Sequence, residues 1–210
     1  MAATTPVSIG KSERIPPRDR LLAVAADLFY RRGIRAVGVE AIAEAAGTNK
    51  MTLYRHFASK DELVAEYLRQ SAKAADACWN RLNQCHPGDA LAQLRGWLAE
   101  VAGHLAGSNE RGCPLANAAV EIPEKEHPAR KVIEEYKLAQ RERLIGLCRA
   151  ADLTEPEMLA DELHLLLEGA RVTAQSVGAD GLGLRLLRMG EAIIAAHAAK
   201  PDTAVASNAR

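Results

Sequence analysis

Aromatic residues make up only 4% of this 210-residue chain, and runs of Val, Ile and Thr are few. The apolar share of 48% is filled largely by Ala and Leu, which are strong helix formers. Because β-branched and aromatic residues are the ones enriched in strands, this composition argues against an all-β fold. Charged residues reach 26%, an ordinary globular level, so we expect one or two folded domains rather than a disordered chain.

Long apolar runs and paired cysteine motifs are also missing. No 18 consecutive residues are apolar, so we expect no membrane span, and the first 15 residues carry no apolar stretch that would predict a secretory signal. No two of the four cysteines have the C-x-x-C spacing of zinc or redox motifs. These absences predict a cytoplasmic protein with free thiols, no metal site and no cofactor.

The chain has no net charge, with 27 basic and 27 acidic residues, but the charge is unevenly distributed. The first 60 residues hold ten Lys and Arg against five Asp and Glu, a net charge of +5, so the remaining residues carry −5. A basic end on a neutral protein indicates a surface for a polyanion such as DNA. The alternative is a chance fluctuation in charge.

Helical periodicity and capping residues recur along the chain and predict an all-α fold of about nine helices. Examples are the prolines at 16 and 17 at a helix start, Gly33 at its end, and Ser59 with Glu62 as a capping box. The predicted helices are 18–32, 39–46, 50–57, 59–84, 89–106, 113–122, 127–151, 155–177 and 182–199. We divide the chain into a disordered arm (1–15), a DNA-binding domain (16–62), a ligand-binding and dimerisation domain (63–200) and a flexible tail (201–210).

The tight turn Ala-Gly-Thr-Asn at 46–49 joins two short predicted helices and is typical of a helix-turn-helix. Apolar Ile42, Ala43 and Ala46 on the first helix can contact Leu53 and Phe57 on the second. The opposite face of the second helix, at i, i+3, i+4 and i+7, carries Thr48, Met51, Thr52 and Arg55. Such a helix spans about 13 Å, which suits a major groove about 12 Å wide. An ordinary helical corner remains the alternative.

Residues 39–63 closely resemble the DNA-binding signature of TetR-family repressors, and residues 28–33, Leu-Phe-Tyr-Arg-Arg-Gly, resemble the end of that family's first helix. The match extends over about residues 17–65. Beyond it, the chain resembles the family only in the number and order of its helices. The resemblance implies an all-helical homodimer that binds operator DNA and represses transcription until a small-molecule effector binds.

The same resemblance implies a role for individual residues. The positions implied to contact DNA bases or phosphates are Thr48, Asn49, Lys50, Met51, Thr52, Tyr54, Arg55, His56 and Lys60. Base contacts are expected from Lys50, Met51, Thr52 and Arg55, and phosphate contacts mainly from the others. For Tyr54 and His56 the alternative is packing against neighbouring helices, and for Lys60 it is a solvated face. The chain departs from the family at Val39, where threonine is usual and a side-chain cap or phosphate donor is missing.

The last two predicted helices are apolar on more than one side, which predicts a homodimer interface. Helix 182–199 has one stripe of Leu182, Leu186, Met189 and Ile193, and a second stripe of Leu184, Leu187 and Ile194. We expect Leu186 and Ile194 to lie in this interface. A larger monomeric core is the alternative.

A pocket for the effector is predicted among the helices between 89 and 151. The candidate lining residues are Trp97, His104, Cys113, Asn117 and Tyr136. Cys113 lies at a predicted helix start close to Arg111, which would favour a reactive thiolate in an electrophile or oxidant sensor. Plain core packing and an inert buried thiol are the alternatives.

Two other function classes stay open. An enzyme on a helical scaffold is possible in principle, but the sequence shows no nucleophile–base spacing and no metal motif, so we name no catalytic residue. A helical adaptor whose helix-turn-helix has lost DNA binding is supported only by Val39. The leading hypothesis is a repressor in which the effector and DNA oppose each other, with helix 59–84 as the lever between the two sites.

Overall fold

The computed structural model describes residues 15–105 and 111–198, and these residues form nine α-helices and no strand. The helices are α1 (Pro17–Arg32), α2 (Val39–Ala45), α3 (Lys50–His56), α4 (Lys60–Cys85), α5 (Ala90–Leu105), α6 (Pro114–Glu121), α7 (Pro128–Ala150), α8 (Pro156–Val177) and α9 (Leu182–Ala196). The predicted all-α fold is therefore confirmed, although α9 ends three residues before the predicted 199. The predicted tail, and the predicted arm apart from Ile15, lie outside the described residues.

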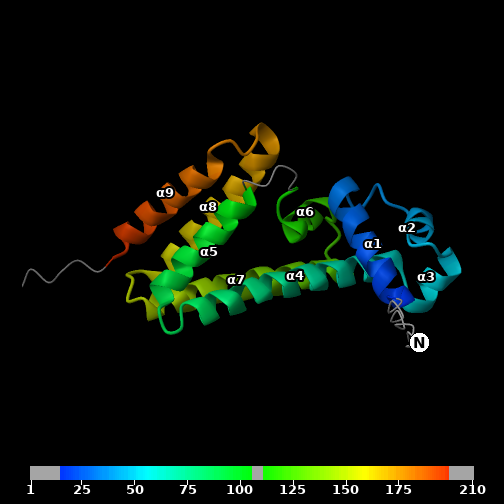
Figure 1. The fold of residues 1–210 in the computed structure, drawn as a ribbon, viewed down its shortest axis with the longest axis horizontal. Coiled ribbons are helices and arrows are strands. Elements are labelled where there is room, and N and C mark those ends of the chain that lie inside the picture. The colour runs from blue at the N-terminus through cyan, green and yellow to red at the C-terminus, as the bar shows by residue number, and fades with distance from the viewer. Residues whose placement is uncertain (1–14, 106–110, 199–210) are drawn as a thin grey trace, which may run out of the picture.

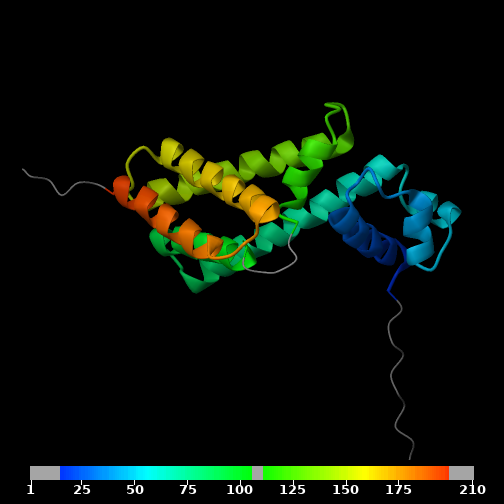
Figure 2. The ribbon, with the colours of Figure 1, turned by 90° about the horizontal axis from the view of Figure 1, so that it is seen from above.

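The molecule is elongated, with α1, α2 and α3 at one end and α5, α8 and α9 at the other (Figure 1). Helices α4 and α7 run side by side along the long axis, and the view from above shows the same arrangement (Figure 2). Helix α6 lies between the two ends. None of the helices in the described ranges combines the length and apolarity that a membrane span requires.

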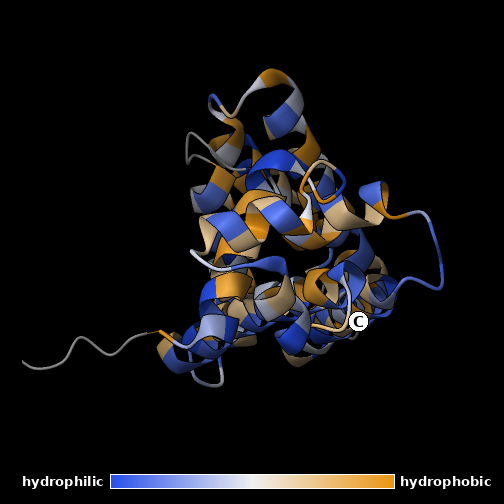
Figure 3. Ribbon diagram, turned by 90° about the vertical axis from the view of Figure 1, so that its right-hand side faces the viewer, coloured by the Kyte–Doolittle hydropathy of each residue, from blue (hydrophilic) through white to orange (hydrophobic). Residues whose placement is uncertain are grey.

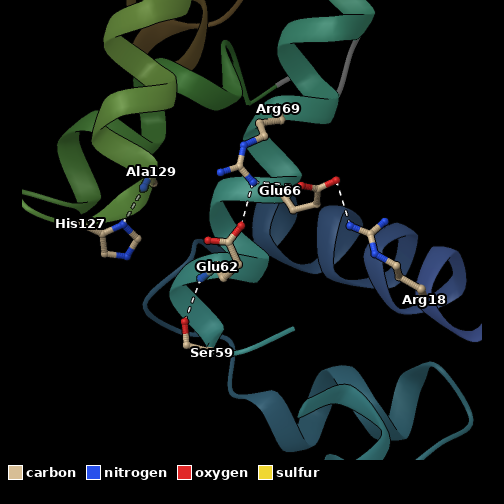
Figure 4. Close-up of polar contacts among 7 residues, drawn as sticks. All are labelled: Arg18, Ser59, Glu62, Glu66, Arg69, His127 and Ala129. Atoms are coloured by element: carbon tan, nitrogen blue, oxygen red, sulfur yellow. Dashed lines mark hydrogen bonds and ion pairs between the residues drawn. The ribbon is translucent and has the colours of Figure 1, made fainter. Parts of the chain in front are cut away.

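Local capping explains where several helices begin and end. The hydroxyl of Ser59 accepts a hydrogen bond from the backbone N–H of Glu62 at 3.0 Å, as the capping box predicts. The carboxylate of Glu62 does not complete the box but pairs with Arg69 at 2.8 Å (Figure 4). At the end of α1, Gly33 adopts φ +89°, a conformation that other residues rarely adopt.

Two hydrophobic cores lie along the molecule. The N-terminal core contains residues of α1, α2, α3 and α6, together with the first turns of α4 and of α7. The C-terminal core contains residues of α5, α8 and α9, together with the second half of α4 and the rest of α7. Because α4 and α7 cross from one core into the other, the segments that pack around the helix-turn-helix include residues as distant as Leu115 and Ile133.

Single helices change from hydrophilic to hydrophobic around their axes (Figure 3), as helices that bury one face do. In α9 the buried residues are Leu182, Leu186, Gly190 and Ile194, four residues apart. Gly190 allows α5 to approach, since a Cβ there would stand 2.7 Å from a methyl carbon of Leu98. The expectation that Leu186 and Ile194 face a dimer partner is therefore wrong, because both are buried within this chain.

Candidate nucleic-acid interface and effector cavity

The predicted packing of the helix-turn-helix is confirmed. Ile42, Ala43 and Ala46 are buried together with Leu53 and Phe57, and the turn passes through Gly47 at φ +63°. Helix α4 and helix α1 hold this unit from behind. Arg18 of α1 lies over the ring of Phe57 at 5.1 Å and pairs with Glu66 of α4 at 3.1 Å (Figure 4).

The outer face of α3 is exposed and includes large side chains. Met51 is 69% exposed and Tyr54 is 41% exposed, and Arg55 and His56 are exposed beside them. Tyr54 and His56 are therefore accessible from solvent, and Tyr54 also contacts Lys50. Exposed apolar and aromatic residues next to a cation are what a helix needs to contact base edges and phosphates.

Asn49 and Thr52 fix the start of α3. The Oδ1 atom of Asn49 accepts hydrogen bonds from the backbone N–H of Thr52 at 2.9 Å and from its hydroxyl at 3.1 Å. The amide group of Asn49 keeps its two N–H donors, which can bind a phosphate. Thr48 is half-buried in the turn just before this cap.

Lys50 pairs with an acidic neighbour on α2. Its Nζ atom lies 2.6 Å from Glu40 and 5.9 Å from the ring centre of Tyr54. The hydrogen bond between them lowers the pKa of Glu40 and raises the pKa of Lys50. A base contact by Lys50 therefore requires that its ammonium group be shared with, or released from, Glu40.

Lys60 has a structural partner that the sequence did not reveal. Its Nζ atom donates to the carbonyl of Ile34 at 2.8 Å, which ties the start of α4 to the loop after α1. An ammonium has three N–H donors, so a phosphate can still bind the others. Val39, the departure from the family pattern, is buried, and the cap of α2 is Gly38 without a side-chain hydrogen bond.

Polar contacts attach α6 and the segment before it to the DNA-binding end. The carboxylate of Glu121 accepts hydrogen bonds from the backbone N–H groups of Ile34 at 2.6 Å and Arg35 at 3.2 Å. Arg111 donates to the carbonyl of Tyr30 at 2.9 Å, and the Tyr30 hydroxyl donates to the carbonyl of Gly112 at 3.3 Å. The end of α1 is thus connected directly to residues 111–121.

A cavity of about 790 Å³ lies where the two cores meet. Its walls come from α4, α5, α7, α8 and the segment that begins α6. Four of the five predicted residues, Trp97, His104, Cys113 and Tyr136, line it. Asn117 does not, since its amide faces the other side of α6 and donates to the carbonyl of Arg111.

Several residues that line this cavity could not be predicted from the sequence. They are Trp79, Gln140, Arg81, Arg111 and Arg171. Trp79 stacks on Trp97 with ring centres 5.7 Å apart, a pairing that the sequence could not show because no local pattern links the two positions. Burial raises the pKa of Tyr136 to about 12, so its hydroxyl is a donor in the wall at neutral pH.

Cys113 caps α6 and is buried in the cavity wall. Cys78 also lines the cavity, and burial raises the pKa of its thiol, which disfavours the thiolate. A sensor role for Cys113 stays a prediction.

The far faces of α8 and α9 keep exposed apolar side chains. On α8, Met158, Leu165 and Val172 recur every seven residues on the side away from the core, and on α9 Leu184 and Met189 are exposed. Exposed apolar surface on neighbouring helices is typical of an interface with another protein.

The described residues thus combine an N-terminal helix-turn-helix with a C-terminal bundle of helices that lines a cavity of about 790 Å³. Residues 21–67 match the family model "Bacterial regulatory proteins, tetR family". Residues 21–67 thus carry the DNA-binding domain of the tetR family, and the helical fold agrees with that of a TetR-family transcriptional regulator.

The similar proteins agree with this assignment. The chain is 52% identical over 60 residues to the HTH-type transcriptional repressor KstR2 of Rhodococcus jostii, covering 29% of this chain and 28% of that protein. It is 40% identical over 63 residues to the transcriptional activator FasR of Mycolicibacterium smegmatis, covering 29% of each. These aligned segments are less than a third of either relative.

The structure of SCO4454, a TetR-family transcriptional regulator from Streptomyces coelicolor, extends the likeness to most of the chain. Its TM-score is 0.82 at 25% identity, covering 87% of this chain and 96% of that one. The sequence likeness to the curated relatives therefore concerns the DNA-binding end, whereas the likeness of fold includes the cavity-bearing domain.

Proposed function

We propose that this protein is a dimeric transcriptional repressor that binds operator DNA through α3 and is released by a small-molecule effector in the cavity. The observation that carries the proposal is the exposed face of α3, where Met51, Tyr54 and Arg55 project from a buried helix-turn-helix. The likeness to the KstR2 repressor is confined to this end of the chain and supports repression. Because DNA lies in the cytoplasm of bacteria, the proposal includes the cytoplasm as the location of the protein.

In this proposal Arg55 contacts a base pair, and Lys50, Met51 and Thr52 contact bases beside it. The phosphates of the DNA backbone are bound by the remaining predicted residues, Thr48, Asn49, Tyr54, His56 and Lys60. Arginine and lysine can donate to guanine O6 and N7, and a threonine methyl can contact the thymine methyl. The phosphate contacts set the register without reading sequence. Two such helices in a dimer would read half-sites about 34–36 Å apart, or multiples of that distance.

The test uses fluorescence anisotropy with a duplex from upstream of the protein's own gene and a scrambled duplex of equal composition. The wild type should prefer the upstream duplex, and an inverted repeat in it would identify the operator. Arg55→Ala should weaken binding to that duplex by about 1–3 kcal/mol and reduce the preference. The exposed Arg149→Gln variant, at the far end of α7, is the matched control and should change neither. Equal binding of both duplexes by the wild type would instead support the adaptor hypothesis.

The effector part of the proposal rests on the position of the cavity. It lies beside α4 and the start of α6, both of which contact the DNA-binding end, so a ligand there can favour one spacing of the two recognition helices. Typical couplings of about 1–3 kcal/mol change operator affinity about 5- to 150-fold. By reciprocity, saturating operator should weaken effector binding by the same factor. Equal ligand dissociation constants with and without operator would contradict this control.

A further inference from the structure

The cavity wall combines apolar and cationic side chains. Its aromatic and aliphatic part includes Trp79, Trp97, Leu115 and Tyr136, which are apolar apart from their ring N–H and O–H groups. Toward α6, Arg111 and Arg171 join the lining from two different segments. These segments are adjacent, because a Cβ built on Gly112 would lie 3.9 Å from the Cβ of Arg171.

Positive charge exceeds negative charge at this end. Arg171 and Lys137 both bind the same carboxylate oxygen of Glu168, at 2.8 and 2.9 Å. Arg111 adds a further cation and donates to a neutral carbonyl, that of Tyr30. The cations at this end are therefore Arg111, Lys137 and Arg171. The carboxylates are Glu168 and, on the other side of Arg111, Glu121, so that positive charge exceeds negative charge by one. At the opposite end, near Cys78, charge is balanced, since Arg81 pairs with Glu100 at 3.6 Å.

Gln140 supplies a second kind of recognition in the same cavity. Its side chain is only 4% exposed, and its Oε1 atom accepts no hydrogen bond from any described residue. A buried acceptor without a donor is unfavourable. The Oε1 atom is itself covered, so the Gln140 side chain must turn toward the cavity before a ligand N–H or O–H can bind it and remove this penalty.

From these features we propose that the effector is a mostly apolar small molecule with one anionic group, held by Arg111 and Arg171, and one hydrogen-bond donor, held by Gln140. This inference rests on the proposed function and specifies the chemical class of its effector. A cavity of about 790 Å³ has the size of sites that enclose such molecules. The guanidinium groups of the exposed Arg111 and the half-buried Arg171 can bind a carboxylate or sulfonate through charge-assisted hydrogen bonds.

Arg111 also connects the ligand charge to the DNA-binding end. Its guanidinium holds the carbonyl of Tyr30 in the last turn of α1, and the Tyr30 hydroxyl holds Gly112 in return. An anion that draws Arg111 into the cavity competes with the contact to α1. A neutral ligand of the same shape does not compete with the Tyr30 carbonyl for the Arg111 guanidinium. The negative charge of the ligand is therefore what weakens the contact between Arg111 and α1.

Two fluorescent probes separate charge from shape. One is 1-anilinonaphthalene-8-sulfonate, and the other is N-phenyl-1-naphthylamine, which has the same rings and N–H donor but no sulfonate. Trp79 and Trp97 are the only two tryptophans of the chain, and both line the cavity, so energy transfer from tryptophan reports binding there. The variants are Arg111→Gln, Arg171→Gln, Gln140→Leu and, as a control for loss of one positive charge elsewhere, Arg149→Gln.

The wild type should bind the sulfonate probe about tenfold tighter than the neutral probe, as charge-assisted hydrogen bonds allow. Arg111→Gln and Arg171→Gln should each remove most of that difference by weakening only the sulfonate probe. Gln140→Leu should weaken the neutral probe, whose N–H is free to donate, and Arg149→Gln should weaken neither probe. Arg111 is exposed, so its variant is expected to fold even if Arg171→Gln does not.

Three results would overturn the ligand class. They are equal affinity of the wild type for the two probes, an equal loss of both probes in Arg111→Gln, and a loss in Arg149→Gln as large as in Arg111→Gln. The role of Arg111 toward α1 is tested by hydrogen exchange of residues 30–35. The sulfonate probe should speed exchange there and the neutral probe should not, and equal exchange with both probes would refute this role.

None of these measurements uses DNA, so they fail or succeed independently of operator binding. A wild type that shows no preference for its upstream duplex would refute the proposed function and leave the probe results standing. Conversely, Arg55→Ala should lose operator binding and keep the affinities for both probes, because α3 does not line the cavity.

Discussion

The two hydrophobic cores of this protein are assembled in different ways. The C-terminal core packs long helices, α5 and α7 to α9 with the second half of α4, along much of their lengths. The N-terminal core packs α1 and two helices of only seven residues, α2 and α3, against the first turns of α4 and against parts of α6 and α7 from much later in the chain. Short helices are marginal alone, so the DNA-binding end depends on α4, α6 and α7 for its stability. The cavity is lined by residues of both cores, which is why the proposed effector would contact both.

The largest effect should come from a charge placed in the C-terminal core. Leu186→Glu should prevent folding or cost more than about 4 kcal/mol, because Leu186 is 1% exposed and the carboxylate would have no partner. Leu165→Glu with Leu184→Glu, at exposed positions on α8 and α9, should keep the fold and yield monomers. Circular dichroism and light scattering distinguish the two cases. Stable dimers of the exposed double variant would show that the homodimer interface lies elsewhere.

Leu53→Ala tests whether the cores unfold separately. Leu53 is fully buried in the N-terminal core, so its truncation should cost about 2–5 kcal/mol there. Both tryptophans belong to the C-terminal core, whereas circular dichroism reports all helices. We expect the dichroism transition to begin at lower denaturant in the variant, with little change in tryptophan fluorescence. A matching shift of both signals would mean that the cores unfold as one unit.

Glu121→Ala should weaken the attachment of α6 to the N-terminal core. Its carboxylate accepts two backbone hydrogen bonds, and their loss should cost about 1.5–3 kcal/mol because they involve a charged group. The control is Glu124→Ala, which removes an exposed ion pair with Arg35 at 3.5 Å and should cost well under about 1 kcal/mol. Urea unfolding followed by dichroism measures both. Similar costs for the two variants would show that the Glu121 contact does not hold α6 in place.

Lys60→Met should produce a smaller, double effect. It removes the hydrogen bond to Ile34, worth about 1.5 kcal/mol at most in this half-buried position, and a predicted phosphate contact. The slope of log operator affinity against log salt concentration should become shallower by about one, the change expected when one phosphate contact is lost. Lys73→Met, on the exposed part of α4, should change neither quantity. An unchanged salt slope in Lys60→Met would show that Lys60 binds only the carbonyl of Ile34 and no phosphate.

The smallest effect concerns pH and the C-terminal core. Burial, with a contribution from Lys137, lowers the pKa of His164, while Glu168 and Asp161 act in the opposite direction and Arg171 in the same. A histidine whose pKa is lower in the folded than in the unfolded state stabilises the fold at pH values above its unfolded-state pKa of about 6.5. This stabilisation is lost as the pH falls from about 6.5 toward the folded-state pKa. His164→Phe should reduce this loss between pH 7.5 and 5 by less than about 1 kcal/mol. Unfolding curves at several pH values measure it, and an identical pH dependence in both proteins would exclude His164 as a source.

The helices and the helix-turn-helix could be predicted because their signals are local. Asn49 caps α3, Ser59 caps α4 and Gly33 ends α1, each through contacts within a few residues. The face of α9 could not be predicted, because Gly190 brings α5 close and selects the line of residues that is buried. For the cavity, aromatic and polar residue types identified four lining residues, but Asn117 lies on the other side of a helix whose orientation depends on its packing.

By itself, the sequence determined which segments are helical, which residues form the turn between α2 and α3, and that Met51 and Arg55 lie on the outer face of α3. Apolar spacing and capping are enough for this, since they act over a few residues. Only the tertiary structure decided that Arg111 reaches Tyr30, 81 positions earlier, and that Glu121 holds Ile34, 87 positions away. Such contacts depend on how α4, α6 and α7 pack together, and no local periodicity encodes which distant residues become neighbours.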